Sequence, residues 1–287
     1  MQPRYGPPVY RIMGVVNVTP DSFSDGGAFL DRGAAIAHGL RLAFEGADLL
    51  DIGGESTRPG ADPVPADEEL DRVIPVIEGI RARNRNVRIS IDTSKAVVAA
   101  AALDAGAGYV NDVTALRGDP GMAALVAERG VGVCLMHMLG TPRTMQAEAR
   151  YDDVVADVKA FLGERIEAAV AAGIARDRIE IDPGIGFAKT IDHNLELLER
   201  LRELTDLRAP IVLGTSRKSF LGTITGRETA ERMPATLATV VMGLERGAEV
   251  FRVHDVAPVR DALAVAAATL ARGWLPTTPT RTTTTTT

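Results

Sequence analysis

The 287-residue sequence is poor in several residue types, and each shortage excludes a class of protein. The single cysteine, Cys134, cannot form an intrachain disulfide, which excludes a disulfide scaffold and fits a reducing compartment. Aromatic residues make up only 4%, too few for a surface that stacks the bases of a single-stranded nucleic acid. Basic residues are not in excess, because the formal net charge is −6, so no nucleic-acid partner is expected.

Long apolar runs are also missing. No stretch approaches the roughly 20 residues that a membrane helix needs, and the opening MQPRYGPPVY lacks the apolar core of a signal peptide. We therefore expect a cytoplasmic protein without a membrane partner. Hydrophobic residues at 46% and charged residues at 24% are typical of a globular domain. The Thr-rich segment 276–287 cannot bury apolar surface and is expected to be a disordered tail.

Short runs rich in Val, Ile and Leu alternate with stretches whose apolar residues recur at helical spacing. Strands are predicted at residues 11–16, 48–52, 87–91, 108–110, 132–135, 179–181, 211–213 and 250–253. Helices are predicted near residues 31–45, 66–83, 95–105, 120–128, 151–172 and 192–204, within 228–245, and near 257–271. Eight strands, each followed by a helix, predict an α/β fold, a single-domain (β/α)8 TIM barrel over residues 1–275. A doubly wound open sheet is the alternative, because alternation alone does not close the sheet.

Polar residues stand where nearly every predicted strand ends. They include Asn17, Asp51, Asp92, Asn111, Asp112, His137, Asp182, Ser216, Arg252, His254 and Asp255. In a barrel the carboxyl ends of the strands meet at one mouth, where barrel enzymes have their active sites. Any one of these residues could be an ordinary turn or helix cap. The convergence of so many carboxylate, amide, imidazole and cationic groups predicts a catalytic site.

Three loops add to this prediction. NVTPDSFSDGG (residues 17–27) and GGESTRPG (residues 53–60) follow the first two strands and are either solvated turns or mobile lids that close on a substrate. GTSRKSF (residues 214–220) follows the seventh strand and is a weak signal for a bound phosphate or carboxylate. Neither a Walker A sequence nor a GxGxxG that opens a helix is present, which argues against a nucleotide site.

Eight segments carry a resemblance to a known family. They are MGVVNVTPDSFSDGG (13–27), DIGGESTRPG (51–60), SIDTSK (90–95), VNDVTA (110–115), LMHMLGTPRTMQ (135–146), DPGIGFAKT (182–190), GTSRKSFLG (214–222) and RVHDV (252–256). In this order they resemble the dihydropteroate synthases of folate biosynthesis. The resemblance implies a barrel-shaped transferase that joins 4-aminobenzoate to 6-hydroxymethyl-7,8-dihydropterin pyrophosphate and releases 7,8-dihydropteroate and pyrophosphate. It also implies Mg²⁺ and a homodimer.

The resemblance implies a pterin site made from several strand ends. Asp182 would accept the 2-amino and N3 donors of the ring, Lys218 would reach O4 and N5, and Asn111 would pair with the remaining edge. A buried ring needs such partners because unpaired polar groups are costly there. The other substrate-binding residues implied on this side are Met136, Phe187, Gly214 and Arg252, whose guanidinium can stack on the ring. Met136 could instead be a barrel core residue.

Pyrophosphate release implies a metal and an anion pocket. Asn17 is the implied Mg²⁺ ligand, and the substrate phosphates would supply further oxygens. Arg252, His254 and Arg58 would bind the anion, although a lone histidine such as His254 is often structural. His137 stays outside the catalytic set, because it can equally be a packing residue.

The second substrate is an arylamine, which is already nucleophilic at pH 7, so no strong general base is expected. Asp92 would stabilise positive charge on the pterin methylene along an ionising, carbocation-like path. Asp92, Arg252, His254 and Lys218 form the implied catalytic set. The carboxylate of 4-aminobenzoate would meet Ser219, and its ring would lie among the loop residues Phe23, Asp25 and Thr57.

Two other functions stay open. A pterin-binding methyltransferase domain would share the barrel and several pterin contacts, but it would not need the SRKS or STRPG sequences. A non-catalytic pterin-binding paralogue should have lost Asn17, Asp92, Arg252 or His254, and all four are present.

Overall fold

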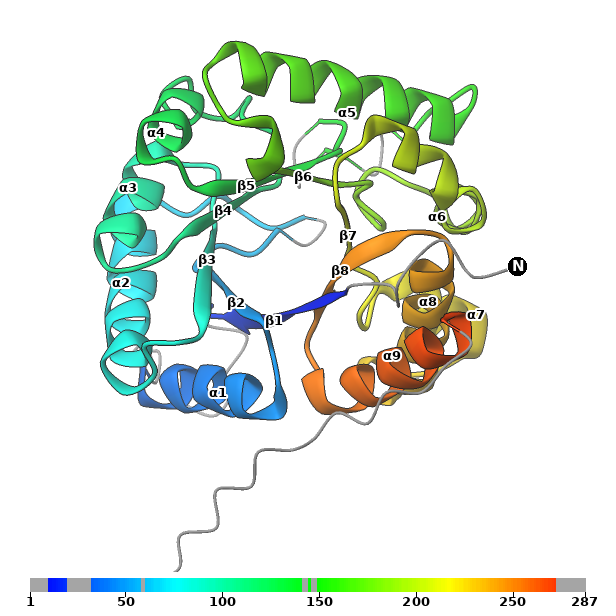
Figure 1. Ribbon diagram of the computed structural model, residues 1–287, viewed down its shortest axis with the longest axis horizontal. Coiled ribbons are helices and arrows are strands. Elements are labelled where there is room, and N and C mark those ends of the chain that lie inside the picture. Colours follow the sequence, from blue (N-terminus) through cyan, green and yellow to red (C-terminus); the bar gives the residue numbers. More distant parts are fainter. Residues whose placement is uncertain (1–9, 20–31, 58–59, 141–143, 146–148, 272–287) are drawn as a thin grey trace, which may run out of the picture.

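The computed structural model describes residues 10–19, 32–57, 60–140, 144–145 and 149–271. Within this part, eight parallel strands pair in sequence order and close into a barrel, with helices around the ring (Figure 1). The strands are β1 (Arg11–Asn17), β2 (Leu49–Gly53), β3 (Arg88–Asp92), β4 (Tyr109–Asp112), β5 (Gly132–Met136), β6 (Ile179–Asp182), β7 (Ile211–Leu213) and β8 (Ala248–Val253). The predicted (β/α)8 barrel is confirmed, and the open-sheet alternative is wrong.

The outer layer consists of helices that cover the strands. They are α1 (Arg32–Glu45), α2 (Ala66–Arg83), α3 (Ala96–Asp104), α4 (Met122–Arg129), α5 (Val154–Ala171), α6 (Ile191–Glu199), α7 (Ser219–Thr225), α8 (Met233–Glu245) and α9 (Val256–Leu270). Alternate strand residues face these helices: Ile52 and Ile91 lie in the same buried cluster as Ile77 and Ile80 of α2. The main hydrophobic core therefore lies between strands and helices, as successive strand side chains point to opposite faces.

The other set of strand side chains points into the barrel. A second buried cluster, separate from the main core, contains Met13, Leu49, Tyr109, Cys134, Val212 and Val250. The residue two positions beyond each of the last five lies on the same side of its strand and is closer to the carboxyl end. These residues are Asp51, Asn111, Met136, Gly214 and Arg252. One apolar layer inside the barrel therefore supports a largely polar layer at the mouth, meaning the carboxyl ends of the strands.

Two elements differ from the sequence prediction. The short helix α7 precedes α8 and was not predicted, because its sequence SFLGTIT contains a glycine and β-branched residues of low helix propensity. The single helix predicted over 192–204 is divided at Arg200 into α6 and a 3₁₀ turn, Leu201–Leu207.

Within the described residues, no helix is both long and apolar enough to cross a membrane. The predicted tail, 276–287, lies outside the described part of the chain.

Candidate active site

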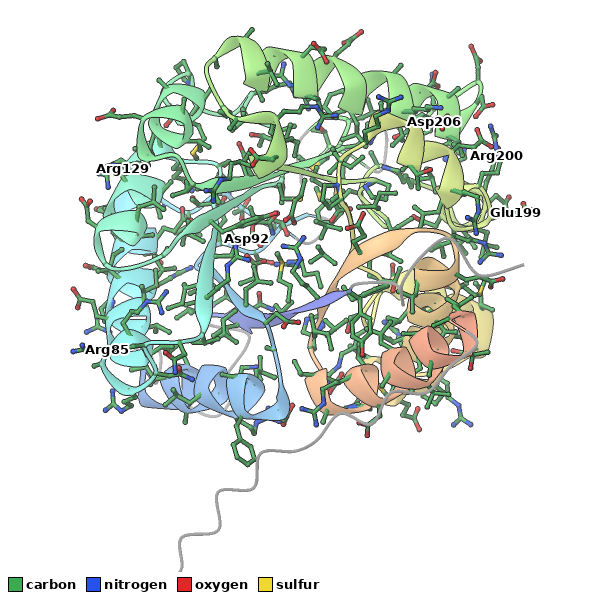
Figure 2. All side chains as sticks on the ribbon, viewed as in Figure 1. Arg85, Asp92, Arg129, Glu199, Arg200 and Asp206 are labelled. Carbon is green, nitrogen blue, oxygen red and sulfur yellow. The ribbon has the colours of Figure 1, made fainter. Side chains whose placement is uncertain are left out.

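A charged cluster from β2, β3, β4 and β8 occupies the mouth of the barrel. Arg252 donates from Nε to Asp51 Oδ2 and from Nη2 to Asp92 Oδ2, each at 2.6 Å. Asp51 also accepts from Ser90 Oγ at 2.6 Å and from Asn111 Nδ2 at 3.0 Å. Figure 2 shows Asp92 inside the ring of strands. The fold thus brings together three predicted site residues, Asp92, Asn111 and Arg252.

Burial and pairing set the charges in this cluster. Burial raises the pKa of Asp92 to about 8, although the Arg252 guanidinium acts in the opposite direction. Burial also lowers the pKa of Arg252, but Asp51 and Asp92 outweigh that effect and raise it, so the guanidinium stays charged. One permanent cation therefore lies between the carboxyl groups of Asp51 and Asp92. Once Asp92 has lost its proton, a carboxylate fixed in such a site can stabilise positive charge that develops on a ligand.

A second pair of opposite charges, Asp182 and Lys218, comes from β6 and from the loop after β7. Asp182 Oδ1 accepts from Gly184 N at 2.7 Å, and burial raises the pKa of Asp182 against the effect of Lys218. Burial lowers the pKa of Lys218 to about 8, against the effect of Asp182. The Lys218 ammonium donates to the Ile185 carbonyl and lies 4.5 Å from the centroid of the Phe187 ring. The two predicted pterin partners therefore lie beside a predicted aromatic contact.

An apolar wall adjoins this pair. It consists of Val113, Met136, Met138, Met145 and Ala188, with Phe187 and Leu139 packed against them. This cluster is separate from the main core, so Met136 belongs to the mouth. Gly214 leaves space nearby, because a Cβ atom there would lie 3.9 Å from both Arg252 Cβ and Asp182 Oδ2. Gly214 therefore lies between the two charged clusters and within contact distance of both.

The loop between β6 and α6 is fixed by a buried lysine, Lys189. Its ammonium donates to the Phe187 carbonyl at 2.9 Å and lies 3.0 Å from His137 Nδ1. Burial lowers the pKa of Lys189 to about 7 and that of His137 to about 2, so His137 stays neutral at pH 7. Gly184 has a φ of +67°, and a Cβ atom there would lie 2.0 Å from the His137 carbonyl oxygen. Close packing of this loop therefore requires glycine at position 184.

A partly buried ionic network holds the first residues of the 53–60 loop against α2. Lys95 Nζ donates to Glu69 Oε2 at 2.6 Å and also to the Glu55 carboxylate. Arg72 Nη1 donates to the Gly54 carbonyl at 2.6 Å. Although burial lowers the pKa of Lys95, its hydrogen bonds with Glu55 and Glu69 outweigh that effect and raise it. The loop that carries Thr57, which is half-buried, is therefore fixed at its first residues.

Two side-chain contacts join the segments that follow the neighbouring strands β7 and β8. His254 Nδ1 lies 3.0 Å from Ser216 Oγ. Arg217 donates to Asp255 from Nε at 2.8 Å and from Nη2 at 2.5 Å. Ser219, the first residue of α7, is exposed. His254 is thus held near the loop that carries Lys218 and Ser219.

The predicted metal ligand and the predicted loop residues are only partly described. Asn17, the last residue of β1, is half-buried and pairs in register with Gly53 of β2. Phe23, Asp25 and Arg58 lie outside the described residues. Within the described ranges, no group of three His, Cys, Asp or Glu side chains could hold a metal ion. The amide oxygen of Asn17 is an oxygen donor of the kind that Mg²⁺ accepts from proteins.

Comparison with known proteins identifies the family. The model of the pterin binding enzyme family matches residues 13–254. The dihydropteroate synthase of Escherichia coli K12 is 45% identical over 260 residues, which are 91% of this chain and 92% of that protein. The chain belongs to the dihydropteroate synthase family.

Solved structures of the dihydropteroate synthase from Xanthomonas albilineans agree with this assignment. The structure with 4-aminobenzoic acid has a TM-score of 0.86 at 53% identity and covers 92% of this chain and 94% of its own. The structure with 7,8-dihydropteroate has a TM-score of 0.83 at 50% identity, with the same coverage. This member of the dihydropteroate synthase family is therefore a transferase of folate biosynthesis.

The structure of this dihydropteroate synthase family member also contains residues to which the motifs assign no role. Asp51 joins Ser90, Asn111 and Arg252, and Lys189 fixes the loop that carries Phe187. One signal for Ser90 was available, because the alternation in Ser90–Ile91–Asp92 puts Ser90 on the same side of β3 as Asp92. The side-chain partner of Lys189 is His137, which is 52 residues away in the sequence, and no local pattern indicates this contact.

Proposed function

We propose that this chain joins 6-hydroxymethyl-7,8-dihydropterin pyrophosphate to 4-aminobenzoate and releases pyrophosphate. The observation that carries the proposal is the electrostatic interaction of Asp182 with Lys218 next to the Met136 and Phe187 wall. A pterin presents N–H donors on one edge and acceptors on another, and a buried carboxylate and ammonium match those groups. Asn111 pairs with the remaining edge of the ring, and Gly214 leaves room for the ring. The dihydropteroate and 4-aminobenzoic acid in the related structures support the same substrates.

The charged cluster supports the loss of pyrophosphate. Asp92 faces the pterin methylene and stabilises positive charge there as the C–O bond to pyrophosphate breaks. Arg252, His254 and Arg58 bind the departing anion, which keeps both of its electrons from that bond. The arylamine nitrogen then attacks the methylene carbon and loses a proton to solvent. No strong general base is required.

The metal in this proposal is Mg²⁺, held by the amide oxygen of Asn17 and by oxygens of the pyrophosphate. When bound, it would neutralise charge on the leaving group. Asn17→Ala should raise the Mg²⁺ concentration needed for turnover while pterin binding, measured by calorimetry without metal, stays nearly intact. Unchanged metal dependence would remove Asn17 from the site.

The direct test of the activity uses the purified chain with the pterin pyrophosphate, 4-aminobenzoate and Mg²⁺, and follows dihydropteroate by chromatography. Formation of dihydropteroate with one equivalent of pyrophosphate is the expected result. Pterin binding without product would indicate a non-catalytic paralogue instead. Methyl transfer to or from a pterin would indicate the methyltransferase alternative.

The aryl site of this proposal is made by Ser219 with the loop residues Phe23, Asp25 and Thr57. Ordering glycine-containing loops costs conformational entropy, which the charged contacts of bound pyrophosphate can offset. We therefore expect 4-aminobenzoate to bind weakly to the empty protein and well after pterin, pyrophosphate and Mg²⁺ have been added. Calorimetric titration of both forms measures this, and equal affinities would exclude such an order.

A homodimer in the cytoplasm completes the proposal. Among the described residues, seven exposed large apolar side chains lie on four helices that pack side by side. They are Ile191 and Leu195 of α6, Ile224 of α7, Val241 and Met242 of α8, and Val265 and Leu270 of α9. An exposed apolar surface of this kind favours self-association. Sedimentation at micromolar concentration should give twice the chain mass of 30.4 kDa.

A further inference from the structure

Asp51 of β2 is fully buried and accepts three hydrogen bonds from side chains on three other strands. Oδ1 accepts from Ser90 Oγ of β3 at 2.6 Å. Oδ2 accepts from Asn111 Nδ2 of β4 at 3.0 Å and from Arg252 Nε of β8 at 2.6 Å. One carboxylate therefore links three strands around the mouth.

Two of these donors are residues of the proposed substrate site, while Asp51 and Ser90 are not. Arg252 is held at two points, by Asp51 through Nε and by Asp92 through Nη2. A planar guanidinium held at two nitrogens has a fixed plane and direction. Asn111 is held through its amide nitrogen, which leaves the amide oxygen as the group that can accept from a ligand.

We propose that Asp51 is a positioning residue that sets the orientation of Asn111 and Arg252 for the pterin substrate. The inference rests on the roles proposed above for those two residues. Asp51 lies in the polar layer at the mouth, two positions beyond Leu49 of the apolar layer. Each of its three partners donates a hydrogen bond to its carboxylate. These contacts account for a carboxylate at this position.

The chain contains a matched control for Asp51. Asp112 is also fully buried near the end of a strand, β4, and also accepts three hydrogen bonds. Its donors are Thr114 N at 2.8 Å, Thr114 Oγ1 at 2.7 Å and Leu116 N at 2.9 Å, all within its own loop. Asp112 therefore has the burial of Asp51 but no hydrogen bond to a proposed substrate residue.

The test compares Asp51→Asn with Asp112→Asn, using calorimetry with 6-hydroxymethylpterin and the KM of each substrate. Asp51→Asn should weaken pterin binding by about tenfold and raise the KM for the pterin pyrophosphate. The KM for 4-aminobenzoate should change little. Asp112→Asn should lower the melting temperature without this substrate-specific effect. Equal kinetic changes in the two variants would overturn the inference.

A double-mutant cycle with Asn111→Ala adds a second readout. If Asp51 acts through Asn111, the double variant should lose less pterin affinity than the product of the two single losses. A loss equal to that product would show that Asp51 does not act through Asn111. If Asn111→Ala alone leaves pterin affinity unchanged, the proposed role of Asn111 is wrong. If Asn111→Ala weakens pterin affinity but Asp51→Asn does not, only the positioning role of Asp51 is overturned.

Ser90→Ala provides a milder variant should Asp51→Asn not fold. It keeps the Asp51 charge and removes one of its three donors. Pterin affinity should fall in the same direction as for Asp51→Asn, but by a smaller factor. Unchanged pterin affinity in a folded Ser90→Ala protein would overturn the inference in that case.

Discussion

At the base of the barrel, where the strands begin, the Glu180 carboxylate is satisfied entirely by neighbours within the protein. It accepts from the Tyr109 hydroxyl at 2.8 Å and pairs with Arg11 Nη2 at 2.8 Å. Two residues further along β6, Asp182 is as buried, yet it faces Lys218 and the space beside Gly214. The same strand thus places one carboxyl group in a structural contact at the base and another beside Lys218 at the mouth.

Burial shifts the pKa values of charged groups at the mouth. Burial raises the pKa of Asp92 to about 8 and lowers that of Lys218 to about 8. Such shifts mean that charged forms are held in a desolvated site at a cost in stability. A bound substrate can offset that cost with its own hydrogen bonds. Substitutions at the mouth should therefore affect the reaction, and substitutions at the base should affect stability.

The largest effect is expected for Asp92→Asn, which keeps the shape of the side chain and removes its charge. If Asp92 stabilises charge mainly in the transition state, turnover should fall by about a hundredfold or more, with a modest change in pterin affinity. Steady-state kinetics and calorimetry measure the two quantities. Equal losses in both would make Asp92 a binding group only.

Glu180→Gln tests the base of the barrel. It removes a charge that pairs with Arg11 and accepts from Tyr109, so the free energy of unfolding should fall by about 1–3 kcal/mol. The turnover of the folded protein should hardly change, because the substitution leaves the mouth residues in place. Urea unfolding and steady-state kinetics provide the check. A large loss of turnover without a loss of stability would reverse the contrast between the two ends.

Asp182→Ala is the counterpart of Glu180→Gln on the same strand. Loss of a buried charged hydrogen-bond partner should weaken pterin binding by at least about tenfold. Calorimetry with 6-hydroxymethylpterin measures the effect. Wild-type affinity in this variant would exclude Asp182 from the pterin site.

The smallest effect concerns pH. Because burial lowers the pKa of Lys218 to about 8, its ammonium is lost near pH 8 and not near the ordinary value for lysine. Pterin affinity should therefore be full below this pH and decline between pH 7 and 9. In Lys218→Met the affinity should be lower throughout and should lack this decline. An identical decline in the variant would assign the titration to another group.

The sequence predicted most of the fold and many of the site residues. The eight apolar strands and the polar residues at their ends predicted a barrel with a site at its mouth, although alternation alone did not exclude an open sheet. The resemblance of the motifs implied roles for Asp92, Asn111, Asp182 and Lys218. It did not predict α7, whose residues have little intrinsic tendency to form a helix. The division of the predicted helix at Arg200 was also missed.

By itself, the sequence determined the periodicity, and hence which residues lie in strands and which stand at their ends, because alternation and helical spacing are local properties. Only the tertiary structure decided which of those residues meet. Arg252 and Asp51 are 201 residues apart in the chain, and closure of β8 onto β1 brings their side chains to 2.6 Å. This pairing depends on the stagger of the strands in the closed barrel, which no local stretch of residues encodes. The burial that shifts the pKa values of the mouth residues is likewise a property of the whole fold.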